Sequence, residues 1–420
     1  MRSRILTAVA ALCLLVVLPA RMSATDGYFM LGYGAKSQGM GGTGVAFPLG
    51  PLSPATNPAG LALAAPGWEF GLGLFNPNRS YDVTGNPSGY PGTFGLAPGK
   101  VTSGSSWFPI PHLGYARKVG ADGVFGVAIY GNGGMNTHYS ARTFGFSPTG
   151  VNLSQLFIAP TYATKLGGKH AIGVTALIGY QMFKAEGLAA FSPFSSDASR
   201  LTDAGNATST GIGVRVGYLG QFTKQFAVGA SYQSKMAMSP FKKYAGLFAG
   251  QGDFDIPSNW TVGIALTPTD TLRLAVDVQQ VRYSEVAAVG NPMLPNLMQA
   301  KLGADSGAGF GWEDMTTVKL GIEQQAGGGF TWRAGYAFGK QPVQPSEVLF
   351  NILAPGVIEQ HATFGFSKAV SGTGSFDFAL TRAFNKSVSG PNPLEAPGQQ
   401  TIKLSMDQWV FTVGYSVKLR

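Results

Sequence analysis

The feature that most constrains this chain is a two-residue alternation of apolar side chains with small or polar ones. In the last segment, the apolar face carries Trp409, Phe411, Val413, Tyr415, Val417 and Leu419. The opposite face there carries Thr412, Gly414, Ser416, Lys418 and Arg420. The same pattern recurs at 212–218 and 332–339. Because successive side chains of a strand point to opposite faces, this alternation indicates β-strands with one apolar face.

The residues on the second face distinguish a membrane barrel from a soluble sheet. Charged residues make up only 12% of the 420 residues, against about 25% in an average soluble domain. Glycine is abundant, with 60 residues. A transmembrane barrel puts apolar side chains against lipid and small or polar ones in its lumen. Since hydrocarbon offers no partner to an open sheet edge, the sheet has to close. We therefore predict an all-β fold, a transmembrane antiparallel β-barrel.

The spacing of the candidate strands supports the same fold. The strands are expected at 67–82, 106–118, 123–131, 151–166, 169–185, 209–222, 226–239, 258–267, 271–282, 315–325, 329–340, 359–370, 374–386 and 408–420. Short turns alternate with long connections, which are 83–105, 132–150, 186–208, 240–257, 283–314, 341–358 and 387–407. Bacterial outer-membrane barrels have an even number of strands, here about fourteen, with short periplasmic turns and long extracellular loops. Residues 67–420 are therefore predicted to form the barrel.

The N-terminal residues 1–24 are typical of a secretory signal peptide. Arg2 and Arg4 precede an apolar run from Ile5 to Leu18, and small residues follow. The run is shorter than the ~20 residues of a spanning helix. Export places the chain in the outer membrane of a Gram-negative bacterium. The one cysteine, Cys13, lies in this segment, so neither a disulfide framework nor a thiolate metal site is expected.

Residues 25–66 are rich in Gly, Ala and Pro and show little alternation. A barrel with this many strands encloses a lumen wider than side chains alone can fill. We predict that this apolar segment folds inside the barrel as a plug, or hatch. A periplasmic tail is the alternative.

Several segments resemble one protein family. Two of them are the start of the mature chain, TDGYFMLGYGAKSQGMGGTGVAF, and the NPAG sequence that begins at Asn57. Two more are FKKYAGLFAGQGDFDIP at 241–257 and GFGWEDMTTVKLG at 309–321. Together they are similar to the long-chain fatty acid transporters of the outer membrane (FadL, TodX and OmpP1 relatives). The resemblance implies a fourteen-stranded barrel with an N-terminal hatch. Hydrophobic ligands would be captured outside, bound in the lumen, and released through a lateral wall gap after the hatch rearranges.

The resemblance also implies that Asn57, Pro58 and Ala59 form the hatch motif. Pro58 fixes its own φ angle and biases Asn57 toward an extended conformation, which would give a stiff corner in the plug. From the residues alone, an ordinary turn is the alternative.

Two of the long loops carry large apolar side chains that would be costly to expose. In the loop at 240–257, Phe241, Tyr244, Leu247 and Phe248 fall at helical spacing. The loop at 186–208 contributes Leu188, Phe191 and Phe194. The resemblance places a first, low-affinity ligand site between two such loops. The alternative is that the loops pack only on each other.

Three cations fall on the lumen face by strand alternation: Arg215, Lys319 and Arg333. A charge-assisted hydrogen bond from one of them could hold a fatty acid carboxylate while apolar side chains bind the tail. The alternative is a salt bridge inside the lumen, and the candidate partners are Glu323, Asp277 and Glu69.

The third expected strand ends in Gly131, Asn132, Gly133 and Gly134. Glycine runs mark bulges and interruptions in strands. The resemblance implies a kink in this strand that opens the lateral gap. A simple transition from strand to loop is the alternative.

No catalytic motif competes with a transport function. Gly39, Gly41 and Gly44 satisfy a GxGxxG pattern, but no strand precedes them and no acidic residue follows at the required distance. GxSxG and HExxH are both missing, so we expect no catalytic residues, no metal site and no cofactor. Despite a net charge of +9, Lys and Arg are not clustered, which argues against nucleic acid binding. Lumen cations and contact with lipopolysaccharide account for the charge.

The sequence therefore predicts a monomeric outer-membrane protein for the passive uptake of long-chain fatty acids or other hydrophobic molecules. The alternative is a structural or adhesive barrel whose loops bind a partner.

Overall fold

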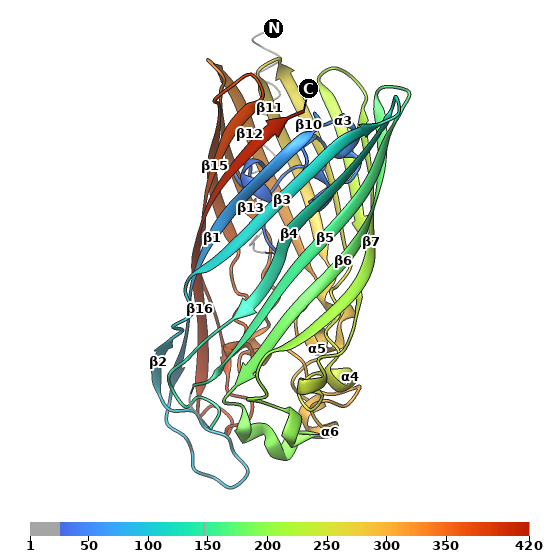
Figure 1. Ribbon diagram of the computed structural model, residues 1–420. Helices are drawn as coiled ribbons and strands as arrows, with labels where there is room; N and C mark the ends of the chain where they lie inside the picture. Colours follow the sequence, from blue (N-terminus) through green and yellow to red (C-terminus); the bar gives the residue numbers. More distant parts are fainter. Residues whose placement is uncertain (1–25, 146–147, 420) are drawn as a thin grey trace.

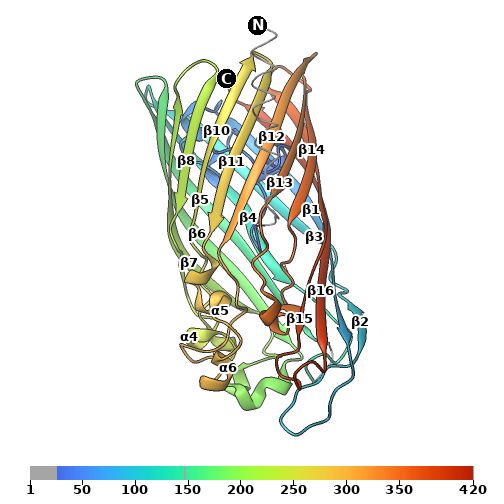
Figure 2. The same ribbon diagram turned by 180° about the vertical axis from the view of Figure 1, so that it is seen from behind.

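The computed structural model describes residues 26–145 and 148–419 and forms a closed antiparallel β-barrel (Figures 1 and 2). The predicted signal peptide at 1–24 lies outside these residues. The wall strands are β1 (Gly67–Thr84), β3 (Phe108–Val119), β4 (Gly123–Asn136), β5 (Gly150–Leu166), β6 (His170–Glu186), β7 (Ala207–Gln221), β8 (Phe226–Gln233), β10 (Asn259–Thr269), β11 (Leu272–Val281), β12 (Met315–Gly327), β13 (Phe330–Phe338), β14 (Gln360–Ala369), β15 (Gly374–Pro391) and β16 (Thr401–Lys418). Each pairs with its neighbours in sequence, and β16 pairs with β1 from Lys418↔Gly67 to Thr401↔Thr84, which closes the barrel. The predicted fold, a barrel of about fourteen strands, is confirmed.

The alternation predicted from the sequence appears in the side-chain exposure of the wall strands. On β1, Trp68, Phe70 and Leu72 are exposed on the outside, whereas Glu69 between them is buried in the lumen. This is the arrangement expected for a barrel whose outer face lies against lipid. No helix among residues 26–145 and 148–419 is long and apolar enough to cross a membrane.

Short turns lie at one end of the barrel and long loops at the other (Figure 1). The loops hold two extra short strands, β2 (Gly99–Thr102) beside β1 and β9 (Ala237–Met238) beside β7. They also hold short helices: η2 (Ala189–Phe194), η3 (Ala198–Arg200), η4 (Lys242–Tyr244), α4 (Ala249–Gly252), η5 (Tyr283–Glu285), α5 (Ala287–Gly290), α6 (Asn296–Gln299), η6 (Pro345–Glu347) and η7 (Phe350–Ile352). The largest buried apolar cluster, which we call the loop-end core, lies mainly among these loops and strand ends.

Three local expectations were wrong. The residues at 241–248 do not form one helical face, because Phe248 is extended (φ −85°, ψ 143°) and separates η4 from α4. Strands β15 and β16 continue into the predicted loop at 387–407, where Val388, Ile402 and Leu404 are buried in the loop-end core. The third wall strand, β4, continues past Gly131 to Asn136 because it still pairs with β5.

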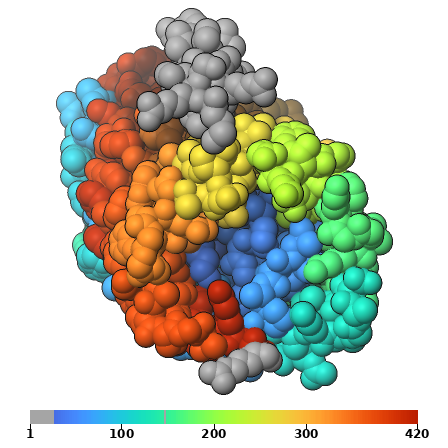
Figure 3. Space-filling model, turned by 90° about the horizontal axis from the view of Figure 1, so that it is seen from above, coloured from blue at the N-terminus to red at the C-terminus, as the bar shows by residue number. Residues whose placement is uncertain are grey.

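The plug, residues 26–66, fills the bore inside the ring of strands (Figure 3). It contains α2 (Gly34–Gln38), η1 (Ser53–Ala55) and α3 (Gly60–Leu63). Glycines of the inner wall allow its backbone to approach closely. A Cβ atom on Gly335 would collide with the backbone of Gly41, and one on Gly229 would collide with the carbonyl of Val45. The glycine content of the strands thus makes room for the plug.

The predicted hatch motif lies where the plug enters α3. The Asn57 side-chain amide donates to the carbonyls of Val45 (2.7 Å) and Tyr218 (2.9 Å), and its oxygen accepts from the Ala59 N–H (3.1 Å). Pro58 packs against the backbone at Gly173 of β6. Asn57 therefore ties the plug both to itself and to β7.

Candidate functional site

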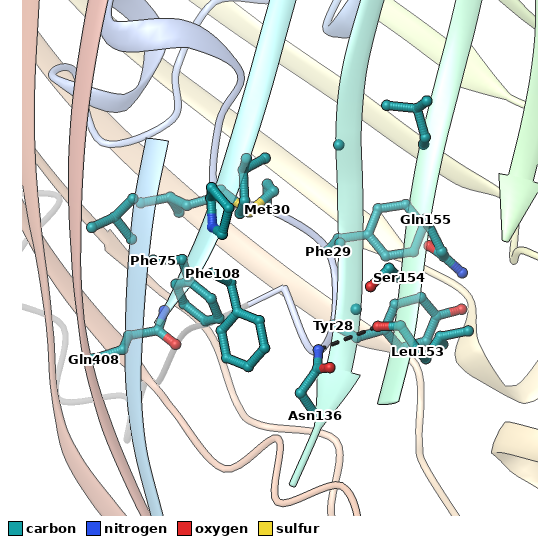
Figure 4. A pocket seen from close by; sticks show the side chains of 18 of the residues that line it. Tyr28, Phe29, Met30, Phe75, Phe108, Asn136, Leu153, Ser154, Gln155 and Gln408 are labelled. Carbon is teal, nitrogen blue, oxygen red and sulfur yellow. Dashed lines mark hydrogen bonds between the residues drawn. The ribbon is translucent and has the colours of Figure 1, made fainter. Parts of the chain in front are cut away.

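The main cavity of the lumen has a volume of about 450 Å³, within the range of small-molecule sites. Its apolar lining residues include Tyr28, Phe29, Met30 and Leu31 of the plug and Phe75, Phe108, Ile110, Leu153, Met406 and Val410 of the wall. Its polar lining residues include Arg79, Asn136, Gln155, His361 and Gln408. Figure 4 shows Phe75 and Phe108 on one side of this space and Leu153 and Gln155 on the other. The mostly apolar lining suits a hydrophobic ligand.

The barrel wall beside this cavity is not fully paired. Pairing of β3 with β4 runs from Val119↔Gly123 to His112↔Tyr130 and stops there. Beyond that point, residues 108–111 of β3 pair with β1 but not with β4. We call this interruption the wall gap.

Two prolines on β3 explain why the ladder stops. Pro109 and Pro111 keep their register opposite Leu74 and Leu72 of β1. A proline has no N–H, so it fits a ladder only where that missing donor would face away from the bonded neighbour. The edge without donors must therefore face β4, where it cannot support pairing.

The first residues of the plug occupy the free edge of β4. Met30 N–H donates to the Asn132 carbonyl, and Gly134 N–H donates to the Tyr28 carbonyl, both at 3.0 Å. Phe29 forms an isolated bridge with Gly133, where a Cβ atom would collide with the Tyr28 carbonyl. We call residues 26–31 the leading segment. It acts as a short strand on β4 at the position that β3 leaves empty.

The glycine run predicted from the sequence therefore lies beside the wall gap and within β4. A bulge between Gly131 and Gly133 shifts the register against β5. The bulged Asn132 accepts from the Tyr33 hydroxyl (2.8 Å) and donates to the Gln155 side chain (2.9 Å). The run joins plug, wall and cavity lining at one place.

The cavity reaches the outer surface through this part of the wall. It is lined by inward-facing residues of β5, such as Leu153 and Gln155, and also by Leu156, Tyr180 and Met182. These last three belong to the outer face of β5 and β6, and Tyr180 is 44% exposed. The cavity is thus open to both the lumen and the lipid-facing side.

The three lumen cations predicted as carboxylate partners are buried, and none of them lines this cavity. Lys319 donates to Asp26 (2.8 Å) and to the Leu31 carbonyl (2.7 Å). Arg215 donates to the carbonyls of Pro54 (2.9 Å) and Ala55. Two of the three cations therefore hold the plug.

The third cation, Arg333, pairs with Glu323 at 2.8 Å, as one of the sequence alternatives expected. Asp277 accepts instead from the plug N–H groups of Gly44 (2.8 Å) and Val45 (3.0 Å). Glu69 pairs with Lys36 of the plug at 2.8 Å.

One cation does line the cavity, Arg79 of β1, and it was not among the predicted carboxylate partners. Its signal was available, since Arg79 shares the inward face of β1 with Glu69. Which inward cation meets a cavity depends on the path of the plug, and the alternation of one strand carries no information about that path.

The two loops predicted to form a first ligand site line a small apolar cavity of about 40 Å³, which we call the outer groove. Leu188 and Phe191 line it from one loop, and Leu247 and Phe248 line it from the other. The other three predicted residues do not line it. Phe241 and Tyr244 pack against Phe183 of β6, and Phe194 packs on the loop-end core.

Aromatic rings connect the outer groove with the main cavity. Phe248 of the groove lies 4.9 Å from Phe254, measured between ring centroids, and Phe254 lies 6.3 Å from Tyr28. Tyr28 also contacts Tyr283 (5.1 Å) and Trp312 (5.9 Å). The space between the two cavities is filled by these side chains.

A family model described as outer membrane protein transport protein (OMPP1/FadL/TodX) matches residues 31–419. The crystal structure of the toluene transporter TodX from Pseudomonas putida is 18% identical, with a TM-score of 0.66 over 93% of this chain and 99% of that chain. A FadL homologue from Pseudomonas aeruginosa is 15% identical, with a TM-score of 0.69 over 94% and 100%. The toluene transporter TbuX from Ralstonia pickettii is 21% identical, with a TM-score of 0.61 over 93% and 99%. At these identities the similarity establishes the fold alone.

A curated relative from Chlorobium limicola, described as an uncharacterized protein in the phosphoenolpyruvate carboxykinase gene 5' region, is 42% identical over 83 residues. The match spans 19% of this chain and 41% of that relative. The family resemblance found in the sequence is confirmed by the family model. Because that model matches nearly the whole of the predicted mature chain, the chain belongs to the OMPP1/FadL/TodX family of outer-membrane transport proteins.

Proposed function

We propose that this chain takes up hydrophobic molecules passively across the outer membrane and releases them sideways through the wall gap. A ligand is captured in the outer groove, moves past the aromatic rings into the main cavity, and leaves between β3 and β4. The concentration gradient sets the direction of transport.

The observation that carries this proposal is the course of the main cavity. It is lined by residues of both wall faces at the place where β3 and β4 stop pairing. An apolar ligand leaving by this route enters lipid and never crosses the polar, plugged half of the lumen. The route therefore avoids the cost of returning an apolar surface to water.

The leading segment of the plug has to leave the free edge of β4 before a ligand can pass through the wall gap. The leading segment occupies the free edge of β4 through two backbone hydrogen bonds. Asn57 and Gly44, deeper in the plug, are bonded to β7 and β11, which do not border the wall gap between β3 and β4. We therefore assign the rearrangement to residues 26–31, while the rest of the hatch stays in place.

The transported compounds are long-chain fatty acids or other hydrophobic molecules. Solved structures of the same fold are described as toluene transporters and as a monoaromatic hydrocarbon channel. A mostly apolar cavity of this volume accommodates either class. We also propose that the chain is a monomer and that it contacts lipopolysaccharide.

A reversible disulfide across the wall gap tests the route. The one cysteine of the sequence, Cys13, lies in the predicted signal peptide, so introduced cysteines would have no competing thiol in the mature chain. A Cβ atom on Gly131 would lie 4.0 Å from the Ile110 Cβ atom, within the ~3.5–4.5 Å of a disulfide. Ile110→Cys with Gly131→Cys should therefore join β3 to β4 across the gap.

The matched control uses the same Ile110→Cys on the paired side of β3. A Cβ atom on Gly73 of β1 would lie 3.8 Å from the Ile110 Cβ atom. Uptake of radiolabelled toluene and dodecanoate is measured in cells expressing each pair, before and after reduction. We expect the oxidised gap pair to block uptake, reduction to restore it, and the control pair to transport in both states.

Unchanged uptake in the fully oxidised gap pair would reject lateral release. If the unmodified chain neither binds nor transports any hydrophobic probe, a structural or adhesive barrel becomes the better explanation.

A further inference from the structure

We propose that a small inorganic anion, chloride under ordinary conditions, binds in a small polar cavity between the plug and the wall strands β7, β10 and β12. The ion compensates the charge of Arg215 and helps to hold the plug in place. This site is separate from the main cavity and does not depend on which hydrophobic compound the chain transports.

The cavity has a volume of about 20 Å³, which exceeds the ~10–15 Å³ that one water molecule needs. Residues 29–33 and Thr56 line it from the plug, and Arg215, Asn259 and Lys319 line it from the wall. Part of the same plug segment also lines the main cavity, so this segment lies between the two. The volume suits a single small ion and excludes a ligand with an alkyl chain or an aromatic ring.

Arg215 is a buried cation that has only neutral partners. It is 3% exposed, and its Nη1 donates to the carbonyls of Pro54 (2.9 Å) and Ala55 and to the Tyr130 hydroxyl (3.3 Å). Its Nη2 donates to the Gln233 side-chain oxygen. In the described part of the chain, 26–145 and 148–419, no ion pair includes Arg215. A buried charge without a counter-charge is costly, so such groups are usually paired or bound to a ligand.

Two buried amide groups beside Arg215 have donors without an acceptor. The register places Arg215 of β7 opposite Gln233 of β8, and Gln233 opposite Asn259 of β10. The Gln233 oxygen accepts from Arg215, which fixes the orientation of that amide, and its Nε2 has no partner. The Nδ2 of Asn259, a residue that is 5% exposed, has no partner either. This row of the wall thus offers N–H groups and a positive charge but lacks an acceptor.

An anion fits these surroundings better than a cation or a neutral molecule. Among the described residues that line the cavity, there is no Asp or Glu. The Lys319 ammonium adds a second positive charge, and the Asp26 carboxylate neutralises only one of the two. Hydrogen bonds to a charged acceptor are stronger than those to a neutral one. A water molecule would accept the same bonds but would leave the charge of Arg215 uncompensated.

The anion affects how firmly the plug is held. Arg215 binds the carbonyls at 54–55, and Lys319 binds both ends of the leading segment. Two like charges that line one cavity repel each other, and an anion between them attracts both. Residues 29–33 and 54–57 of the plug are therefore more firmly attached when the ion is bound.

Bromide tests the site directly, because it is a halide with a strong anomalous X-ray signal. The unmodified protein is purified in detergent and crystallised in sodium bromide, and diffraction is measured at the bromine absorption edge. In solution, amide hydrogen exchange is compared in sodium chloride and in sodium gluconate of equal ionic strength. Gluconate is too large for the cavity.

Three variants accompany these measurements. Asn259→Asp keeps the shape of the side chain and places a carboxylate at the site, so it replaces the anion. Asn259→Leu removes the amide donor. Ser258→Ala is the matched control, because the Ser258 hydroxyl is also buried without a partner but does not line the cavity.

We expect a bromine peak in the cavity of the unmodified protein and of Ser258→Ala, and none in Asn259→Asp. In the first two proteins, exchange at 29–33 and 54–57 should be about tenfold slower in chloride than in gluconate, as for a ligand at about ten times its dissociation constant. Asn259→Asp should exchange equally slowly in both salts, and Asn259→Leu equally fast.

A cavity without bromine, or equal exchange of the unmodified protein in the two salts, would show that the cavity holds water only and would overturn the assignment. These measurements decide the matter even if Asn259→Leu does not fold. The N–H groups of Gly44 and Val45 bind Asp277 and do not line the cavity. If chloride slows exchange there by the same factor, the salt acts on overall stability, and the assignment is likewise wrong.

Discussion

Lys319 of β12 and Asp26 of the leading segment form an ion pair with 2.8 Å between Nζ and Oδ2, and both side chains are at least nine-tenths buried. The two residues lie 293 positions apart in the sequence. The Lys319 ammonium group also donates to the Leu31 carbonyl (2.7 Å) and to the Gln279 side-chain oxygen (2.6 Å). Lys319 thus holds both ends of the leading segment, Asp26 and Leu31, to β12.

Removing one partner of this pair should release the leading segment. Lys319→Met leaves the Asp26 carboxylate buried without a counter-charge, which costs about 3–5 kcal/mol in comparable pairs. Detachment of residues 26–31 avoids that cost more easily than unfolding of the barrel. We expect faster amide hydrogen exchange at 28–33 and unchanged exchange in the wall strands, measured by mass spectrometry.

The double variant Asp26→Asn with Lys319→Met is the control for that experiment. It removes both charges, so the reason for detachment disappears. Exchange at 28–33 should return toward that of the unmodified protein. Slow exchange in Lys319→Met alone would show that backbone pairing with β4, and not the ion pair, retains the segment.

A methyl group at Gly133 should displace the leading segment from β4. The added Cβ atom would collide with the Tyr28 carbonyl, which belongs to the backbone and cannot move alone. Gly133→Ala is therefore expected to increase the rate of ligand uptake by opening the wall gap. Gly372→Ala is the control, because a Cβ atom there has no neighbour within 4 Å. Uptake slower than that of the control would contradict the assigned role of the segment.

Much of the fold could be predicted because it depends on a local pattern. Side-chain alternation alone placed Arg215, Lys319 and Arg333 on the inner face, and all three are buried there. The alternation of short and long connections indicated a barrel with turns at one end and loops at the other, as observed. The helical spacing at 241–248 predicted one apolar helical face, and that prediction was wrong. The aromatic residues there pack on β6 and on other loops and not along one helix.

The site was harder to predict because it depends on contacts between distant segments. The plug determines which inward cations are occupied, and it reaches Lys319 and Arg215 but leaves Arg79 beside the cavity. The sequence shows the glycine run at 131–134, but its partners Tyr28 and Met30 lie far away along the chain, and no local pattern indicates the pairing. Pro109 and Pro111 did carry a signal, since two prolines in one strand mark an edge.

Shortening Phe254 should open the passage from the outer groove to the main cavity. Its ring lies between Phe248 of the groove and Tyr28 of the cavity. The neighbouring rings are held by hydrogen bonds, from Trp312 to Asn351 (2.6 Å) and from Tyr283 to the Asp26 carbonyl. Phe254 has no polar atom on its side chain, so packing alone holds its buried ring between the two cavities. Phe254→Ala should raise the uptake rate, and Phe254→Trp should lower it. Equal rates in the two variants would contradict a gating role.

The loop that carries Phe254 should be more stable in mild acid than at neutral pH. Burial and the neighbouring Asp255 raise the pKa of the Asp253 carboxyl from 3.8 to about 6. Asp255 itself pairs with Lys235 at 2.9 Å. A carboxyl with a raised pKa binds its proton more readily in the folded loop than in the open one, so its stabilising contribution is complete below pH 3.8 and is lost as the pH rises through about 6.

Limited proteolysis within 240–257 should therefore be slower at pH 5 than at pH 7.5, with a protease whose activity is calibrated at both values. Asp253→Asn should remove most of this difference, because the amide keeps the shape of the side chain but does not titrate. Cleavage that is equally fast at the two pH values in the unmodified protein would show that the two carboxylates are already accommodated as charged groups.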